Sequence, residues 1–292
     1  MIYLGLSILL SSLLYVIFKL FDVYKINTLQ AIVVNYLVAF ITGIISSNGT
    51  YDITTVLKSD WLFLAMFMGI LFITIFNVMA LTAQRNGLSV ASVASKMSLV
   101  IPVIAGFTIF NEEWNILKAI GIIIALAAVY FTTVNKKSQS NIDWTPKKLL
   151  LPLALFVGSG IIDTVLKILQ NNHMSNSNED VISATIFSFA FIAGSAAVIY
   201  RLINKNEKLE WKSLVGGIVL GIPNFFSIVV ILKALNSPGL ESTFVYPINH
   251  VGTVVLSTMF GLFLFKENLK SRNVLGIILA IIAIVFIAFA KA

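Results

Sequence analysis

The sequence contains no cysteine and only two histidines, His173 and His250. The absence of cysteine excludes disulfide bonds, thiol catalysis and cysteine-ligated metal sites. The sequence also lacks a phosphate-binding glycine loop, a pair of histidines at metal-ligand spacing and a Gly-x-Ser-x-Gly nucleophile elbow. We therefore expect a protein that is not an enzyme and that binds neither a cofactor nor a metal ion.

Charge is scarce as well, because only 11% of the 292 residues are charged, whereas 58% are hydrophobic and the mean hydropathy is +0.96. This composition predicts an all-α integral membrane protein. A bilayer-spanning helix needs roughly 20 mainly apolar residues. Polar breaks divide the chain into ten such spans, at 2–21, 28–47, 59–83, 88–110, 115–134, 149–170, 180–203, 211–235, 240–265 and 272–290. The first segment has no basic start and no cleavage site, so we expect it to be retained as a helix.

Several features recur in the same order at a distance of about 150 residues. They are Ser11, Tyr15 and Lys19 with Ser159, Asp163 and Lys167; Trp61 with Trp211; Gly87-Leu88 with Gly239-Leu240; Glu112 with Glu267; and the small-residue faces that begin at Gly121 and Gly276. Each copy holds five spans, an odd number, so the second copy must enter the membrane inverted. The sequence therefore predicts a 5+5 inverted repeat, a feature typical of secondary transporters. The repeats are 1–134 and 149–292, joined by the basic linker 135–148 in one integrated transmembrane domain.

The segment 239–267 carries polar residues three or four positions apart, which places them on one helical face. This stripe consists of Ser242, Tyr246, Asn249, Thr253 and Ser257. His250 lies near its middle, and Lys96 holds the corresponding place in the segment 87–112, with Ser89 and Ser92 on its face. Polar groups at membrane depth are costly, and they suggest a function.

We expect the substrate to be bound by residues of the central spans, and an acid or the central histidine to carry a coupling proton. The substrate-binding candidates are Lys96, His250, Tyr246, Asn249, Asn77, Asn224, Ser92 and Tyr15, and the coupling candidates are Asp163 and His250. Structural alternatives exist for each. A lysine can snorkel to the interface, which we expect of Lys19, Lys167 and Lys233 near span ends. The histidine and the asparagines can bond to a neighbouring helix, the polar stripe can be buried against one, and Asp163 can pair with Lys167 one turn away.

The segments 87–112 and 239–267, which recur as copies of each other, both end in a Phe-x-Glu motif. The motifs run from Phe110 to Glu112 and from Phe265 to Glu267, and a glycine follows nine residues after each glutamate. With the five-plus-five spans, this pattern resembles the drug/metabolite transporter superfamily, specifically its EamA-domain members. The resemblance implies a bacterial inner-membrane carrier that works by alternating access, with a central cavity lined by spans 1, 3, 4, 6, 8 and 9. The small multidrug resistance branch has a glutamate in the middle of its first span, where this chain has Tyr15. The resemblance therefore does not imply proton-coupled export of cationic drugs.

We expect a secondary transporter, an exporter, of a small anionic or zwitterionic metabolite such as an amino acid or organic acid. The alternatives are a sugar or other neutral metabolite carrier of the same fold, or a non-transporting scaffold or accessory subunit. The expected partners are the substrate, the lipid bilayer and protons but no nucleic acid, in a monomer or homodimer.

Thirteen Lys and Arg residues lie in the loops on one side of the predicted spans, and three lie on the other side with both termini. Basic loops stay cytoplasmic, which predicts both termini outside. Many relatives with this layout keep both termini inside.

Overall fold

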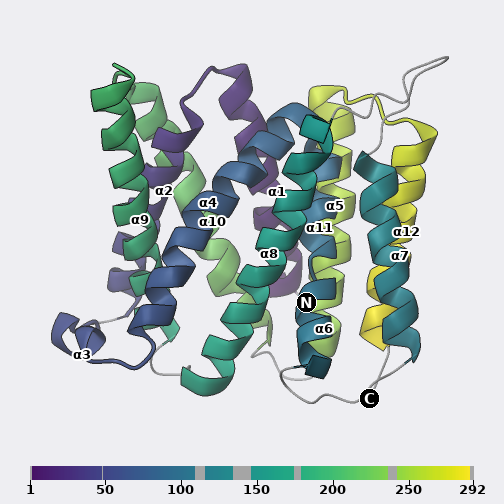
Figure 1. The fold of residues 1–292 in the computed structure, drawn as a ribbon, viewed down its shortest axis with the longest axis horizontal. Coiled ribbons are helices and arrows are strands. Elements are labelled where there is room, and N and C mark those ends of the chain that lie inside the picture. Colours follow the sequence, from purple (N-terminus) through teal and green to yellow (C-terminus); the bar gives the residue numbers. More distant parts are fainter. Residues whose placement is uncertain are drawn as a thin grey trace. The chain divides into compact units, whose positions relative to one another are not determined.

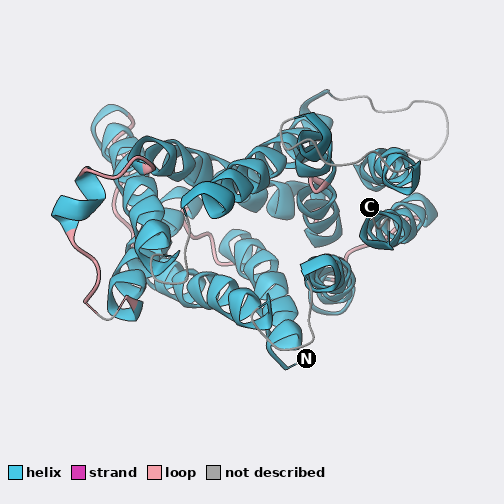
Figure 2. Cartoon of the chain, turned by 90° about the horizontal axis from the view of Figure 1, so that it is seen from below, coloured by secondary structure: helices cyan, strands magenta, loops and turns pink. Residues whose placement is uncertain are grey.

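The computed structural model describes residues 2–47, 49–108, 116–133, 146–173, 179–235 and 242–289. These residues form helices and connecting loops, and no strand occurs among them (Figure 2). The helices, labelled in Figure 1, are α1 (Ile2–Val23), α2 (Thr28–Ser46), α3 (Ile53–Leu57), α4 (Leu62–Asn86), α5 (Leu88–Met97), α6 (Val100–Thr108), α7 (Ile116–Thr133), α8 (Pro146–His173), α9 (Glu179–Asn204), α10 (Trp211–Leu235), α11 (Ser242–Phe265) and α12 (Ser271–Phe289).

Eight helical stretches within the described residues are long and apolar enough to cross a membrane, and shorter apolar stretches, Ala119–Thr132 and Ser271–Ile287, lie in α7 and α12. Large apolar side chains on these helices are exposed; Phe63, Trp211 and Phe263 are 74%, 74% and 75% accessible. Hydrocarbon solvates such side chains, and a helix satisfies its own backbone there. The chain is a polytopic helical membrane protein, as its composition predicts. The number ten and the 5+5 arrangement stay predictions.

The predicted span 88–110 is interrupted, because α5 and α6 are separated by a turn at Ser98 and Leu99. Pro102 explains the interruption: proline has no N–H to donate to the carbonyl of residue 98, and its ring crowds that carbonyl. The N–H of Ile101 donates to the Ser98 carbonyl instead, at 2.9 Å. The turn begins two residues after Lys96, so it fixes the backbone near a candidate site residue.

The short helix α3 lies in a loop between two predicted spans and was not expected. The Asp52 carboxylate caps it by accepting hydrogen bonds from the N–H groups of Thr54 and Thr55, at 3.2 and 3.1 Å. Both threonine hydroxyls also donate to this carboxylate, at 2.6 Å. These bonds, first those of the Thr54 and Thr55 hydroxyls, lower the pKa of Asp52 from 3.8 to about 2.

Contacts divide the chain into two units. Unit 1 comprises Met1–Lys19, Val78–Ile161 and Ser227–Ala292, and unit 2 comprises Leu20–Asn77 and Ile162–Phe226. The divisions fall inside α1, α4, α8 and α10, so each of these four helices contributes to both units.

In unit 1, α7 and α12 pack together along small residues (Figure 1). Four alanines of this seam are at most 1% exposed: Ala125, Ala128, Ala280 and Ala283. At Gly121 and at Gly276, an added Cβ would meet a neighbouring atom at 2.6 Å. The packing faces predicted from the sequence are confirmed, and they contact each other.

The contacts of the two glycines show that α7 and α12 run antiparallel. A Cβ on Gly121, early in α7, would lie 3.2 Å from the carbonyl oxygen of Ala283, late in α12. A Cβ on Gly276, early in α12, would lie 2.9 Å from the carbonyl oxygen of Ala128, late in α7. Gly276 stands 155 positions after Gly121, and Ala283 stands 155 positions after Ala128. The two contacts are therefore the same contact with the two helices exchanged.

In unit 2, α2 and α9 pack in the same manner. A Cβ on Gly43 would lie 2.9 Å from the Cβ of Ala184, and one on Gly194 would lie 2.7 Å from Cγ2 of Val33. Gly194 stands 151 positions after Gly43, and Ala184 stands 151 positions after Val33. These helices also run antiparallel, and they too exchange equivalent contacts.

An aromatic cluster surrounds Tyr36 in the core of unit 2. Tyr36 is fully buried, and its ring centroid lies 5.6 Å from that of Phe76 and 6.0 Å from that of Phe187. Such pairs contribute about 0.5–1.5 kcal/mol beyond the burial of their area. The cluster packs α2 against α4 and α9.

Candidate functional site

The two predicted central cations, Lys96 and His250, contact each other in unit 1. Nδ1 of His250 on α11 lies 3.3 Å from the carbonyl oxygen of Lys96, and both residues are partly buried. Lys96 lies in the last turn of α5. The last four carbonyls of a helix have no partner within the helix, so the Lys96 carbonyl is open to a donor from a neighbouring helix.

This contact fixes the orientation of the imidazole ring. A carbonyl oxygen only accepts hydrogen bonds, so Nδ1 of His250 carries the hydrogen and donates it to Lys96. Nε2 is then the ring atom that accepts from a further partner when the ring is neutral and donates to one when the ring is cationic. In the cationic ring, Nε2 can donate to a carboxylate or phosphate oxygen.

The residues directly before the two cations also contact neighbouring helices. Nδ2 of Asn249 donates to Oγ of Ser7 at 2.7 Å, between α11 and α1. The hydroxyl oxygens of Ser95 and Ser159 lie 3.5 Å apart, between α5 and α8. Positions 249 and 95 are 154 apart, as are the two cations. Lys96 and His250, which the predicted repeat makes counterparts, are thus in contact with each other.

The polar stripe on α11 is buried where its side chains are described. Asn249 is 1% exposed, and Thr253 and Ser257 are fully buried. Their partners include α1, because Oγ of Ser12 lies 3.5 Å from the carbonyl oxygen of Thr253. The alternative that the stripe is buried against another helix therefore holds for these three residues. The side chains of Tyr246 and Ser242 lie outside the described part of the chain.

Two further candidates of unit 1, Ser92 and Tyr15, are buried. Ser92 is fully buried, and its hydroxyl donates to the Ser89 carbonyl of its own helix at 3.1 Å. Tyr15 on α1 is 3% exposed. The substrate-binding role of Ser92 and Tyr15 stays a prediction.

The other three candidates belong to unit 2. Nδ2 of Asn224 donates to Oδ1 of Asn35 at 3.1 Å, and both side chains are buried. Nδ2 of Asn77 donates to the Ile73 carbonyl of its own helix at 2.8 Å. Asp163 is half-buried on α8. Asn224 is thus used between α10 and α2, and Asn77 within α4.

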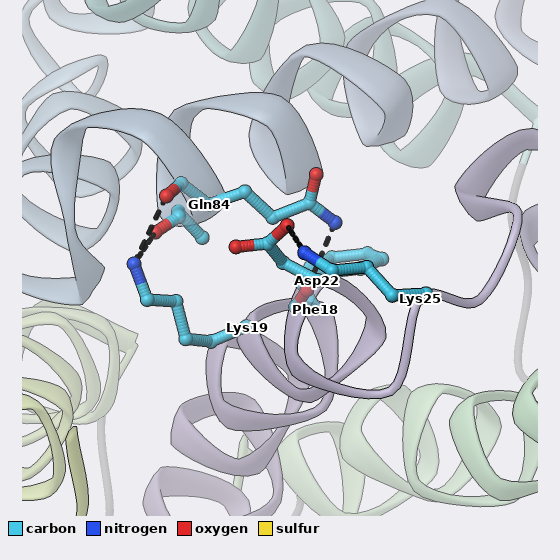
Figure 3. Close-up of polar contacts among 6 residues, drawn as sticks. Phe18, Lys19, Asp22, Lys25 and Gln84 are labelled. Atoms are coloured by element: carbon cyan, nitrogen blue, oxygen red, sulfur yellow. Dashed lines mark hydrogen bonds and ion pairs between the residues drawn. The ribbon is translucent and has the colours of Figure 1, made fainter.

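The structure adds a polar cluster in unit 1 at the break between α4 and α5, which the sequence did not assign. Nζ of Lys19 donates to the carbonyl oxygens of Gln84, at 2.9 Å, and of Ala83, at 3.3 Å, while Nε2 of Gln84 donates to the Phe18 carbonyl at 3.0 Å (Figure 3). The ammonium group of Lys19 thus binds carbonyls in the last turns of α4, and the expectation that Lys19 snorkels to the interface stays a prediction.

On the other side of the break, Glu267 binds the start of α5. The Leu88 N–H donates to Oε1 of Glu267 at 2.9 Å. Gly87 has φ +102°, which a side chain would strain, and a Cβ on Gly87 or Gly261 would come within 2.9 or 2.6 Å of the carboxylate. Two glycines therefore make room for one acid. The recurring acid after the doubled segment was a sequence signal, but its partner was not predictable.

Comparisons with known proteins support the fold but give no information on an activity. No family model matches the chain. A protein of Haemophilus influenzae described as uncharacterized is 29% identical over 286 residues, covering 95% of this chain and 94% of its own length. One solved crystal structure, of a protein described without a function, covers 97% of this chain and 94% of its own, with a TM-score of 0.59 at 14% identity. That similarity supports the helical fold alone.

Proposed function

We propose that this protein is a secondary transporter of a small anionic or zwitterionic metabolite, such as an amino acid or organic acid. We propose further that it is a ten-span, 5+5 inverted-repeat exporter related to the EamA-domain branch of the drug/metabolite transporters, in the bacterial inner membrane. The contact between Lys96 and His250 carries the proposal. Sites of inverted-repeat transporters lie near the midplane at the interface of the repeats.

Three properties of this contact favour an anionic ligand group. Both residues are cations or potential cations, both lie within candidate spans, and they occupy counterpart positions 96 and 250. Like charges at this depth are costly unless an anion or a neutral ring relieves them. A substrate carboxylate or phosphate between the Lys96 ammonium and Nε2 of His250 would supply that relief.

The test is transport by purified protein in proteoliposomes, with a substrate first found by thermal-shift screening of a metabolite library, because a ligand of the native state raises its apparent stability. Lys96→Ala should lower the transport rate at least tenfold with unchanged expression. Lys205→Ala, in an exposed loop of unit 2, is the matched control and should leave transport unchanged. Near-normal transport by Lys96→Ala would refute the site.

A coupling proton is tested with the same preparation. If His250 or Asp163 carries it, transport varies with pH, and His250→Gln or Asp163→Asn flattens that variation. Both profiles unchanged would remove the two residues from coupling. In the structural alternative, His250 only caps α5, so His250→Gln would lower the unfolding temperature without changing the pH profile of transport.

Two other functions remain open to the same assays. A sugar or other neutral metabolite carrier would need only the hydroxyl and amide groups, and Lys96→Ala would then spare its transport. A non-transporting scaffold or accessory subunit would show no uptake or efflux at all in proteoliposomes. The counterpart contact of two cations favours the anionic substrate over both.

A further inference from the structure

A polar cavity of about 220 Å³ lies in unit 1 beside the break between α4 and α5. Its polar and charged lining is Lys19, Arg85, Asn86, Ser89, Glu267, Asn268 and Asn273. It lies where the candidate spans Leu62–Asn86 and Leu88–Ala105 meet, beyond the end of the span Ile248–Phe265. The cavity is therefore at the ends of the spans. Lys96, which contacts His250, lies about two turns further along α5.

The cavity has the volume of roughly seven water molecules, at about 30 Å³ each. That is the size of a small amino acid or of a lipid headgroup fragment. One of its lining groups is the hydroxyl of Ser89, a residue 1% exposed, and this hydroxyl has no hydrogen-bond partner among the described residues. A buried polar group without a partner is costly, so it indicates a missing one.

Charges of both signs line the cavity. Lys19 is tied to the α4 carbonyls through Nζ, and Arg85 is exposed in the last turn of α4. Glu267 uses Oε1 to accept from the Leu88 N–H at the positive end of the α5 dipole, so this end already holds one carboxylate. A simple anion would be attracted by the two cations and repelled by Glu267. A ligand with an anionic group and an ammonium group would satisfy all three charges.

We propose that this cavity is a second binding site, which accepts a small ammonium-bearing anion. The anionic group is bound by Arg85, Lys19 and the Ser89 hydroxyl, and the ammonium group by Glu267. The ligand is either a free amino acid or the headgroup of phosphatidylethanolamine, which share this chemistry. The inference concerns binding alone and does not depend on transport.

Binding is measured by calorimetry on the full chain in detergent, with glycine and phosphoethanolamine as probes and with acetate, methylammonium and inorganic phosphate as single-charge references. Glycine or phosphoethanolamine should bind at least tenfold more tightly than any reference. Glu267→Gln keeps an oxygen for the Leu88 N–H but removes the charge, so the fold is retained and the preference falls about tenfold. Ser89→Ala should weaken binding about threefold. Glu207→Gln and Ser188→Ala, both in unit 2, are matched controls and should change nothing.

The variants also separate the ligand sources and the two sites. If Glu267→Gln loses co-purified phosphatidylethanolamine and phosphoethanolamine binds more tightly than glycine, the ligand is the lipid headgroup. If glycine binds more tightly and the co-purified lipid is unchanged, the ligand is a free amino acid. Acetate binding as tightly as glycine to the wild type would overturn the proposal. So would binding that Lys96→Ala abolishes while Glu267→Gln leaves it intact, because the ligand would then occupy the central site. Loss of transport in Lys96→Ala with intact glycine or phosphoethanolamine binding would support both sites separately.

Discussion

Replacing Gly276 by alanine should destabilise the seam between α7 and α12. The new Cβ would lie 2.6 Å from Cγ2 and 2.7 Å from the backbone nitrogen of Thr132, and 2.9 Å from the carbonyl oxygen of Ala128. Ordinary contact needs at least 3.4 Å, so the helix backbones must separate by roughly half an ångström or more. A gap of that size forfeits about a quarter to a half of each contact along the seam. Overpacking of this kind costs about 1–3 kcal/mol, while the alanine returns up to about 1 kcal/mol of helix propensity.

The matched control is Gly5→Ala in α1, because nothing lies within 4 Å of a Cβ at that position. Thermal unfolding of the purified protein, followed by circular dichroism, should show a lower midpoint for Gly276→Ala by about 2–6 °C. Gly5→Ala should match or exceed the wild type. Adding Thr132→Ser to Gly276→Ala removes only a methyl group, so it should not restore stability. Full recovery in that double variant, or an unchanged midpoint for Gly276→Ala, would refute a backbone contact at this seam.

Three further predictions use other features of the chain. A double-mutant cycle of Ser7→Ala and Asn249→Ala, read by thermal unfolding, should give a coupling of about 0.5–1.5 kcal/mol, and additive effects would exclude their bond. The lowered pKa of Asp52 means that its cap is complete above pH 3.8 and is lost as the pH falls toward about 2; amide exchange at Thr54 should accelerate over that range relative to Asp52→Asn, whose exchange should lack this step. The basic loops predict that a reporter fused after Ala292 is active only outside the cytoplasm, and cytoplasmic fluorescence from such a fusion would reverse the orientation.

Helix positions could be predicted because apolar length and polar breaks are local signals. The predicted spans 2–21, 28–47 and 211–235 correspond to α1, α2 and α10 within two residues at each end. The turn between α5 and α6 was not predicted, although Pro102 was visible, because a proline within a span can also be tolerated by local adjustment. The helix α3 was missed because five residues carry no periodic signal.

The candidate site, like the helices, was predicted from the sequence only in part. Sequence spacing identified Lys96, His250 and Asn249 as central polar residues, but the partners of a polar group come from helices distant in sequence. Ser7 and Asn35 were missed because a lone serine or asparagine in an apolar segment looks like any other small polar residue. A hydrogen bond over 242 positions, as between Asn249 and Ser7, has no local signature.

The paired contacts bear on the proposed inverted repeat more directly than the sequence matches do. Helices α7 and α12 are counterparts in the two proposed copies, as are α2 and α9, and each pair runs antiparallel and exchanges equivalent contacts. If the second copy had entered the membrane in the same direction as the first, counterpart helices would run parallel.

A twofold relation between inverted copies requires that some counterpart residues meet at its axis. The contact between Lys96 and His250 has that property within unit 1. Counterpart residues at such an axis are brought together from both copies at once, so they are suited to bind one ligand from two sides. This geometry supports placing the substrate there, and it separates that site from the cavity at the break between α4 and α5, which is built from residues that are not counterparts of one another.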